Sequence, residues 1–159
     1  MENINSQNLE ELGGFHSFEI IPITDILTSP TVLTNSNVSK FTYTKNKSNN
    51  TIIQPVGETL IVSCKPRKTA QGLLYRISSS LEIKSPSSEI DTLLNKIINQ
   101  GFVLKVNTYA DSSILYGSKI FPLELSYQHV YSKKQETPAK TVVSIKGKIP
   151  QKPVYTTNK

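Results

Sequence analysis

The stretch from Leu73 to Lys84 alternates between apolar and polar residues at almost every position. The apolar residues that share one face are Leu73, Tyr75, Ile77, Leu81 and Ile83. Successive side chains of a β-strand point to opposite sides of the sheet, whereas a helix repeats every 3.6 residues. The period of two therefore predicts a half-buried strand, with Arg76, Ser78, Ser80, Glu82 and Lys84 on its other face.

A single helix is predicted directly after this strand. Ser85-Pro86-Ser87 breaks the strand, and Ser88 is the expected N-cap, with Asp91 as its acidic partner in a capping box. The apolar residues that follow at helical spacing are Ile90, Leu93, Leu94, Ile97 and Ile98. Gly101 is the expected C′ residue. We predict a helix over 88–100 that covers the open face of a sheet.

Other segments of the chain also have strand patterns: 15–23, 38–44, 58–65, 102–109, 121–131 and 141–149. Pro22 favours an edge position for the first of these strands, since proline cannot donate to a ladder. Gly147 interrupts the last strand and predicts a bulge or a close backbone approach. Residues 66–72 are expected to form a basic connecting loop, and 110–117 a turn or short hairpin.

These elements predict a mainly β fold, either a sandwich or a strongly curled antiparallel sheet with one short helix at 88–100. The alternative is an α+β sheet with the helix across one face. We expect an N-terminal extension over 1–14, one β-rich domain over 15–149 and a C-terminal tail over 150–159. The predicted core residues are Leu60, Val62, Tyr75, Ile77, Leu81, Ile83, Leu93, Leu94, Ile97, Phe102, Leu104, Val106, Leu123, Leu125, Val143 and Ile145.

Composition narrows the cellular context. One cysteine, Cys64, excludes an intramolecular disulfide, and its place in the alternation Leu60, Val62, Cys64 predicts a packed thiol. The N-terminus lacks the basic and apolar regions of a signal peptide, and no apolar stretch has the length of a membrane span. We expect a protein with no membrane association, made in the cytoplasm.

Charge is distributed unevenly along the chain. The net charge is +6, but residues 1–39 hold five acids and no Lys or Arg, so the remaining residues carry +11, which is +6 minus −5. Such asymmetry predicts interaction arms. An acidic arm could meet the basic face of a neighbouring copy, or a basic face could lie near nucleic acid. The candidate assembly contacts are Leu9, Glu10, Glu11, Leu12, Lys65, Arg67, Lys68, Lys133, Lys134 and Lys152.

Residue patterns for catalysis or metal binding are absent from the sequence. His16 and His129 are far apart, and one Cys with two His cannot close a structural zinc site alone. There is no G-x-S-x-G segment and no phosphate-binding glycine loop. We expect no catalytic, cofactor-binding or metal site and no enzyme activity. Sequence-independent contact with nucleic acid stays open, although only two of the eighteen basic residues are arginine.

The C-terminal half carries a recurring sequence pattern. Tyr116-Gly117-Ser118-Lys119 precedes Pro122-Leu123-Glu124-Leu125-Ser126-Tyr127, and the segment from Val143 to Lys148 reads VSIKGK before Pro150 and Pro153. This pattern resembles one in small virion proteins of tailed phages that infect Bacteroidota, including crAss-like phages and related prophages. The intervening loop departs from that pattern, since it contains the basic and polar run 133–138.

The resemblance implies a non-enzymatic structural subunit of the virion, in the neck, a head–tail connector ring or the tail. Its partners would be copies of itself in a ring and neighbouring virion proteins, with packaged DNA close to its basic surface. It would be located in the virion and assembled in the host cytoplasm. The alternative is a cytoplasmic β-rich adaptor domain that binds other proteins.

Overall fold

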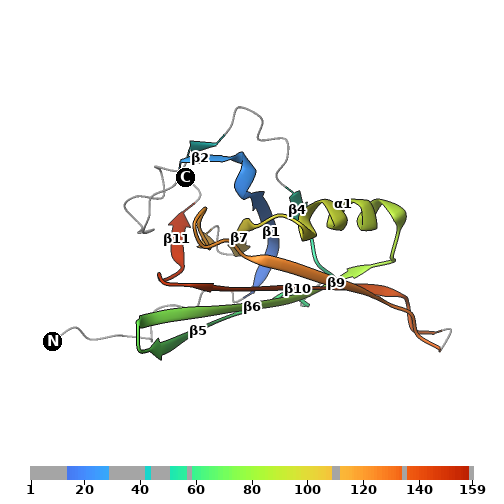
Figure 1. Cartoon of the computed structure of the whole chain (residues 1–159). Helices are drawn as coiled ribbons and strands as arrows, with labels where there is room; N and C mark the ends of the chain where they lie inside the picture. The colour runs from blue at the N-terminus through green and yellow to red at the C-terminus, as the bar shows by residue number, and fades with distance from the viewer. Residues whose placement is uncertain are drawn as a thin grey trace.

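The computed structural model describes residues 14–28, 42–43, 51–56, 59–108, 112–133 and 136–157 (Figure 1). Its first sheet has five antiparallel strands in the order β11-β8-β7-β1-β4. These strands are β1 (Phe15–Pro22), β4 (Thr51–Ile53), β7 (Phe102–Thr108), β8 (Ser112–Tyr116) and β11 (Val154–Thr157). The prediction of a mainly β fold with a single helix is confirmed for the part of the chain that is described.

The second sheet has four antiparallel strands in the order β5-β6-β10-β9. They are β5 (Ile61–Thr69), β6 (Gly72–Lys84), β9 (Glu124–Val130) and β10 (Lys140–Ile149). The 3-10 turn η1 (Ile23–Asp25) leads into a two-stranded ribbon of β2 (Ile26–Thr28) and β3 (Thr42–Tyr43). Hairpins alternate between the sheets along the chain, because β5-β6 and β9-β10 belong to one sheet and β7-β8 to the other.

A continuous hydrophobic core joins the two sheets. Phe18, Leu104 and Ile114 of the five-stranded sheet share it with Ile77 and Ile145 of the four-stranded sheet. The five-stranded sheet also buries its opposite face, in a second cluster formed by Ile21, Ile26, Val103, Leu115 and Val154. The four-stranded sheet has only one buried face, which explains why β6 alternates so regularly.

Helix α1 (Ser88–Ile98) lies beside the strands of the five-stranded sheet, over the inner side of the four-stranded sheet (Figure 1). Leu94 and Ile97 reach the common core. The expected N-cap was wrong by one residue, because the Ser87 hydroxyl accepts the Ile90 amide, and Asp91 is therefore not in a capping box. Gly101 does not adopt the positive φ of a C′ glycine. It is instead packed tightly, since a Cβ there would lie 2.7 Å from the Pro122 Cβ.

Three predictions about strands were wrong. The segment 110–117 is not simply a turn or short hairpin, because residues 112–116 form β8, which pairs with β7. The segment 66–72 is not a loop, because β5 continues through Pro66 to Thr69 and turns at residues 70–71 into β6. β5 is an edge strand, where proline is tolerated. β1 is not an edge strand, since it pairs with β7 on one side and β4 on the other. Pro22 is acceptable there because it is the last residue of the strand.

The ends of the domain also differ from the prediction. The 150–159 segment is not a separate tail, because β11 pairs with β8 and Val154 is buried. Leu93, predicted in the core, is exposed, whereas Val62 and Ile83 are partly buried against the core. The other predicted core residues are buried. Residues 1–13 of the predicted extension lie outside the described residues. The candidate contacts Leu9, Glu10, Glu11 and Leu12 belong to this segment.

Candidate functional site

The outer side of the four-stranded sheet gathers basic side chains at one end. Strand register places Lys65 of β5 opposite Arg76 of β6, and Arg76 opposite Lys148 of β10. These three cations therefore form one row across three strands, which lie about 4.8 Å apart. Arg67 and Lys146 stand one pleat away on the same side, and Lys68 lies at the hairpin end. We call these six exposed residues the basic face: Lys65, Arg67, Lys68, Arg76, Lys146 and Lys148.

Two adjoining cavities open on the basic face. The smaller, of about 250 Å³, is lined by Arg67, Lys68, Thr69, Leu74, Arg76 and Lys148. The larger, of about 730 Å³, shares Arg76 and Lys148 and adds Lys146, Glu124 and the segment Ile120–Pro122. Ile120 is 56% exposed and Phe121 37% exposed, so this segment is an apolar lip beside the cations. The arrangement can bind an anion and, next to it, a flat or apolar group.

Alternation along β5 and β6 produces the basic face. Tyr75 and Ile77 point into the core, so Arg76 between them must point out. On β5 the partly buried Cys64 packs against the core, and burial raises the pKa of its thiol. Lys65 and Arg67 flank Pro66 and project with Arg76. A packed rather than reactive cysteine is what the sequence predicted.

Few acidic groups oppose these cations. Glu124 lies opposite Lys146 in the register and lines the larger cavity. At the other end of the same sheet, the Lys140 Nζ lies 2.5 Å from the Glu82 Oε1 and is neutralised. None of the three ion pairs recorded among the described residues involves the basic face. The positive charge of this end is therefore available to an external partner.

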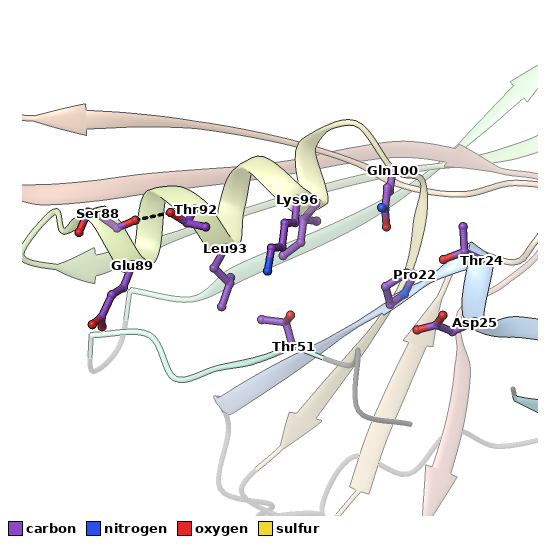
Figure 2. A pocket seen from close by; sticks show the side chains of 11 residues that line it. Pro22, Thr24, Asp25, Thr51, Ser88, Glu89, Thr92, Leu93, Lys96 and Gln100 are labelled. Carbon is purple, nitrogen blue, oxygen red and sulfur yellow. Dashed lines mark hydrogen bonds between the residues drawn. The ribbon is translucent and has the colours of Figure 1, made fainter. Parts of the chain in front are cut away.

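A third cavity, of about 660 Å³, lies between α1, the end of β1 and the start of β4 (Figure 2). Glu89, Leu93 and Lys96 extend into it from the helix, opposite Thr51. Leu93 therefore faces this cavity and not the core. Asp25 of η1 lies at the far end of the cavity from Glu89 (Figure 2), so the two carboxylates are not placed as an acid–base pair.

Helix α1 and strand β9 are joined by a polar cluster. The Tyr127 hydroxyl donates to Asp91 Oδ1 at 2.5 Å, and His129 Nε2 lies 3.4 Å from the same oxygen. The other ring nitrogen of His129 is 2.9 Å from the hydroxyl of buried Thr141. The hydrogen bond from Tyr127 keeps the pKa of Asp91 below its usual value, and the same bond raises the pKa of Tyr127. The cluster attaches the helix to the sheet, and it shows that His129 has partners the sequence did not predict.

The residues that carry the virion-protein resemblance have structural roles. Gly117 has φ +91, which glycine adopts without strain, and the Ser118 amide and hydroxyl both bond to Phe121 to close a turn. Lys119 donates to the carbonyls of Ile26 and Leu27, at 2.7 and 3.1 Å. The pattern thus encodes the connection between β8 and β9.

Gly147 and Leu123 form the other part of this pattern. A Cβ at Gly147 would overlap with Cδ2 of the fully buried Leu123. The register with β6 runs through Gly147 without a shift, so the predicted bulge is absent and the predicted close approach is confirmed.

The structure separates the predicted contact residues. Lys65, Arg67 and Lys68 are brought together, but on an edge strand and not in a loop. Lys133 follows β9 at the opposite end of the sheet, and exposed Lys152 lies between β10 and β11. Lys134 is outside the described residues.

Sequence reasoning missed Arg76, Lys146, Lys148 and Phe121 as part of this site. The outward alternation of the first three was visible in the sequence. Their alignment with Lys65 depends on the strand register, which the predicted loop at 66–72 concealed.

Within the described ranges, no group of three or more His, Cys, Asp or Glu residues could hold a metal ion. No helix in these ranges is long and apolar enough to cross a membrane. Comparison with known proteins found no matching family model, curated protein or solved structure.

Proposed function

We propose that this chain is a non-enzymatic structural subunit of a tailed-phage virion, in a neck or connector ring or in the tail. It would act through contacts with copies of itself and with neighbouring virion proteins, in particles assembled in the host cytoplasm. The proposal joins the sequence resemblance to one structural observation, the character of the sheet edges.

That observation is an exposed large apolar side chain on three of the four outer strands of the two sheets and directly after the fourth. Ile52 on β4 is 64% exposed, Tyr155 on β11 63% and Ile61 on β5 65%. Tyr131, directly after β9, is 71% exposed. Monomeric proteins usually protect sheet edges with charges, since a free edge can pair with another chain. Apolar groups at these positions favour assembly through the edges.

The roles of the resemblance residues support the same proposal. Gly117, Lys119 and Gly147 position strands and a turn, so the pattern specifies a building block and not a reaction. The start of the edge strand β5 is a candidate for a subunit contact because it exposes Ile61, whereas Lys65, Arg67 and Lys68 protect the rest of this edge from pairing.

The decisive experiment is quantitative mass spectrometry of density-gradient-purified particles from a host that carries this gene. A structural subunit should copurify in a fixed ratio to the capsid and tail proteins. Absence from purified particles would rule the proposal out.

A test on the isolated protein addresses the edge contacts. Ile61→Lys should shift self-association, followed by sedimentation velocity over a concentration series, to higher concentration. Ile98→Lys is the matched control, since Ile98 is an exposed apolar residue on α1 and not on β5. Equal behaviour of the two variants would remove β5 from the interface.

The second candidate, a cytoplasmic adaptor domain, rests on the same exposed edges. It predicts a stable complex with one host or phage protein in lysate and no copurification with particles. The mass-spectrometry experiment therefore separates the two functions.

A further inference from the structure

We infer that the basic face binds the phosphate backbone of nucleic acid without reading its sequence. This inference is independent of the virion role, because it uses only the basic face and the neighbouring Phe121. The argument rests on the identity of the cations, their arrangement, and the aromatic side chain beside them.

The cations include both arginines of the chain. Arg67 and Arg76 line the same small cavity, together with Lys68 and Lys148. A guanidinium presents a planar fork of N–H donors that matches two phosphate oxygens at once, which an ammonium cannot do. The Thr69 hydroxyl at the edge of the cavity already donates to the Gly72 carbonyl, at 2.8 Å, so the cations supply the donors of this cavity. The chemistry is that of an oxyanion site.

The arrangement suits a polymer of anions better than a single ligand. Lys65, Arg76 and Lys148 lie in a row across three strands, and Lys146 adds a further positive charge beside β9. A nucleic acid carries one charge per nucleotide and can meet several of these cations together, releasing counterions as it binds. The N-terminal segment 1–14 has only three acidic residues, Glu2, Glu10 and Glu11. The competing occupant, that segment from a second copy, has three carboxylates for six cations and would leave half of the face unpaired.

Phe121 supplies the second element of a nucleic-acid site. Its ring is partly exposed and lines the larger cavity with Arg76 and Lys148. Aromatic rings beside a basic groove stack with bases of any sequence. The adjoining Ile120 and Pro122 keep this position apolar. A backbone on the cations would therefore place a base within reach of the ring.

The test uses fluorescence anisotropy of the full-length protein with a labelled thymine homopolymer and, separately, a labelled duplex. The binding constant should fall steeply with salt, by about 0.9 log units per log unit of salt for each duplex phosphate contact and about 0.7 for a single strand. For about four contacts, this is a loss on the order of 10²-fold between 50 and 200 mM salt.

Two triple variants of equal net charge identify the surface. Arg67→Gln/Arg76→Gln/Lys148→Gln should weaken binding at least about tenfold and flatten the salt slope by about 2 to 3 units. The control, Lys84→Gln/Lys96→Gln/Lys133→Gln, removes three exposed cations elsewhere and should bind like wild type. All six residues are exposed, so the melting curves should coincide and confirm that both variants are folded.

Phe121→Ala distinguishes the two forms of nucleic acid. Loss of stacking should weaken the single strand by at least about fivefold and leave the duplex nearly unchanged. An equal loss on both would overturn the role assigned to Phe121.

Three results would overturn the inference as a whole. The first is that wild type does not bind at low salt. The second is that the control triple loses as much affinity as the basic-face triple, which would make the effect one of net charge. The third is that the basic-face triple loses only self-association, which would assign the face to a carboxylate-bearing partner such as the acidic segment of a second copy. None of these results depends on whether the protein is found in particles.

Discussion

Replacing Gly147 by alanine tests how closely β10 packs against Leu123, the residue directly before β9. The added Cβ would overlap with Leu123 Cδ2 and lie 3.5 Å from the Cα and Cγ of the same residue. Leu123 is fully buried in the common core, so its side chain has little room to move away. Carbon atoms pack best at about 3.5–4.0 Å, and the overlap must be relieved by a strained rotamer or a strand shift.

The magnitude follows from two opposing contributions. Overpacking a core costs about 1–3 kcal/mol, and replacing a strand glycine by alanine returns about 0.5–1 kcal/mol of backbone entropy. We expect Gly147→Ala to lower the free energy of unfolding by about 1 to 2 kcal/mol, which is a decrease of about 2 to 8 °C in Tm for a chain of this size.

A double-mutant cycle in urea, followed by circular dichroism, isolates the contact. Leu123→Ala alone should cost about 2–5 kcal/mol, because it leaves a cavity. In the double variant the new Cβ has no Cδ2 to collide with, so the total should fall short of the sum by at least about 1 kcal/mol. Ser144→Ala, on the outward side of β10, is the control and should change stability by less than about 0.5 kcal/mol.

Additive effects in the cycle, or a Gly147→Ala variant as stable as wild type, would refute this reasoning. The glycine would then be a simple strand residue, and the close approach of Leu123 would not constrain position 147.

Three further perturbations test the helix and the thiol. Leu94→Ala should cost about 2–5 kcal/mol in urea unfolding, whereas Leu93→Ala, which faces the cavity of Figure 2, should cost less than about 1 kcal/mol; equal losses would contradict the docking of α1. The pKa of Asp91 is lowered in the folded state, so its contribution to stability is complete above the unfolded value of about 3.9 and is lost as the pH falls through the folded pKa. Asp91→Asn should therefore reduce the loss of stability at acidic pH, measured by urea unfolding at a series of pH values. An unchanged loss would show that the polar cluster does not attach the helix to the sheet. Burial raises the pKa of the Cys64 thiol, so alkylation by iodoacetamide near neutral pH should be slow in the folded protein and speed up markedly in urea; equal rates would show that the thiol is not packed.

The helix illustrates how far local patterns reach. Apolar spacing located α1 almost completely, because a 3.6-residue period depends only on the helix itself. The choice between Ser87 and Ser88 as the N-cap differs by one residue and depends on local backbone angles that the pattern does not contain. Leu93 faces a cavity that Pro22 of β1 and Thr51 of β4 also line, so its environment depends on tertiary packing and not on the helix pattern.

The basic face illustrates the opposite case. Pro66 indicated a break in the strand, yet an edge strand can accept proline, and the edge position of β5 was not visible in its own sequence. Once β5 is extended, Lys65 meets Arg76 and Lys148 through register alone. The approach of Phe121 follows from the turn that Gly117 and Ser118 form after β8.

The sequence by itself determined the elements with a strong period: the strand at 73–84, the helix after it and the strand that begins at Phe102. Each depends on the alternation or spacing of residues near one another in the chain. The tertiary structure alone decided strand order, register and the pairing of β11 with β8, because these depend on contacts between residues distant in sequence. The candidate site belongs to this second group. Its cations come from three strands, and only the antiparallel ladders place Lys65, Arg76 and Lys148 in one row.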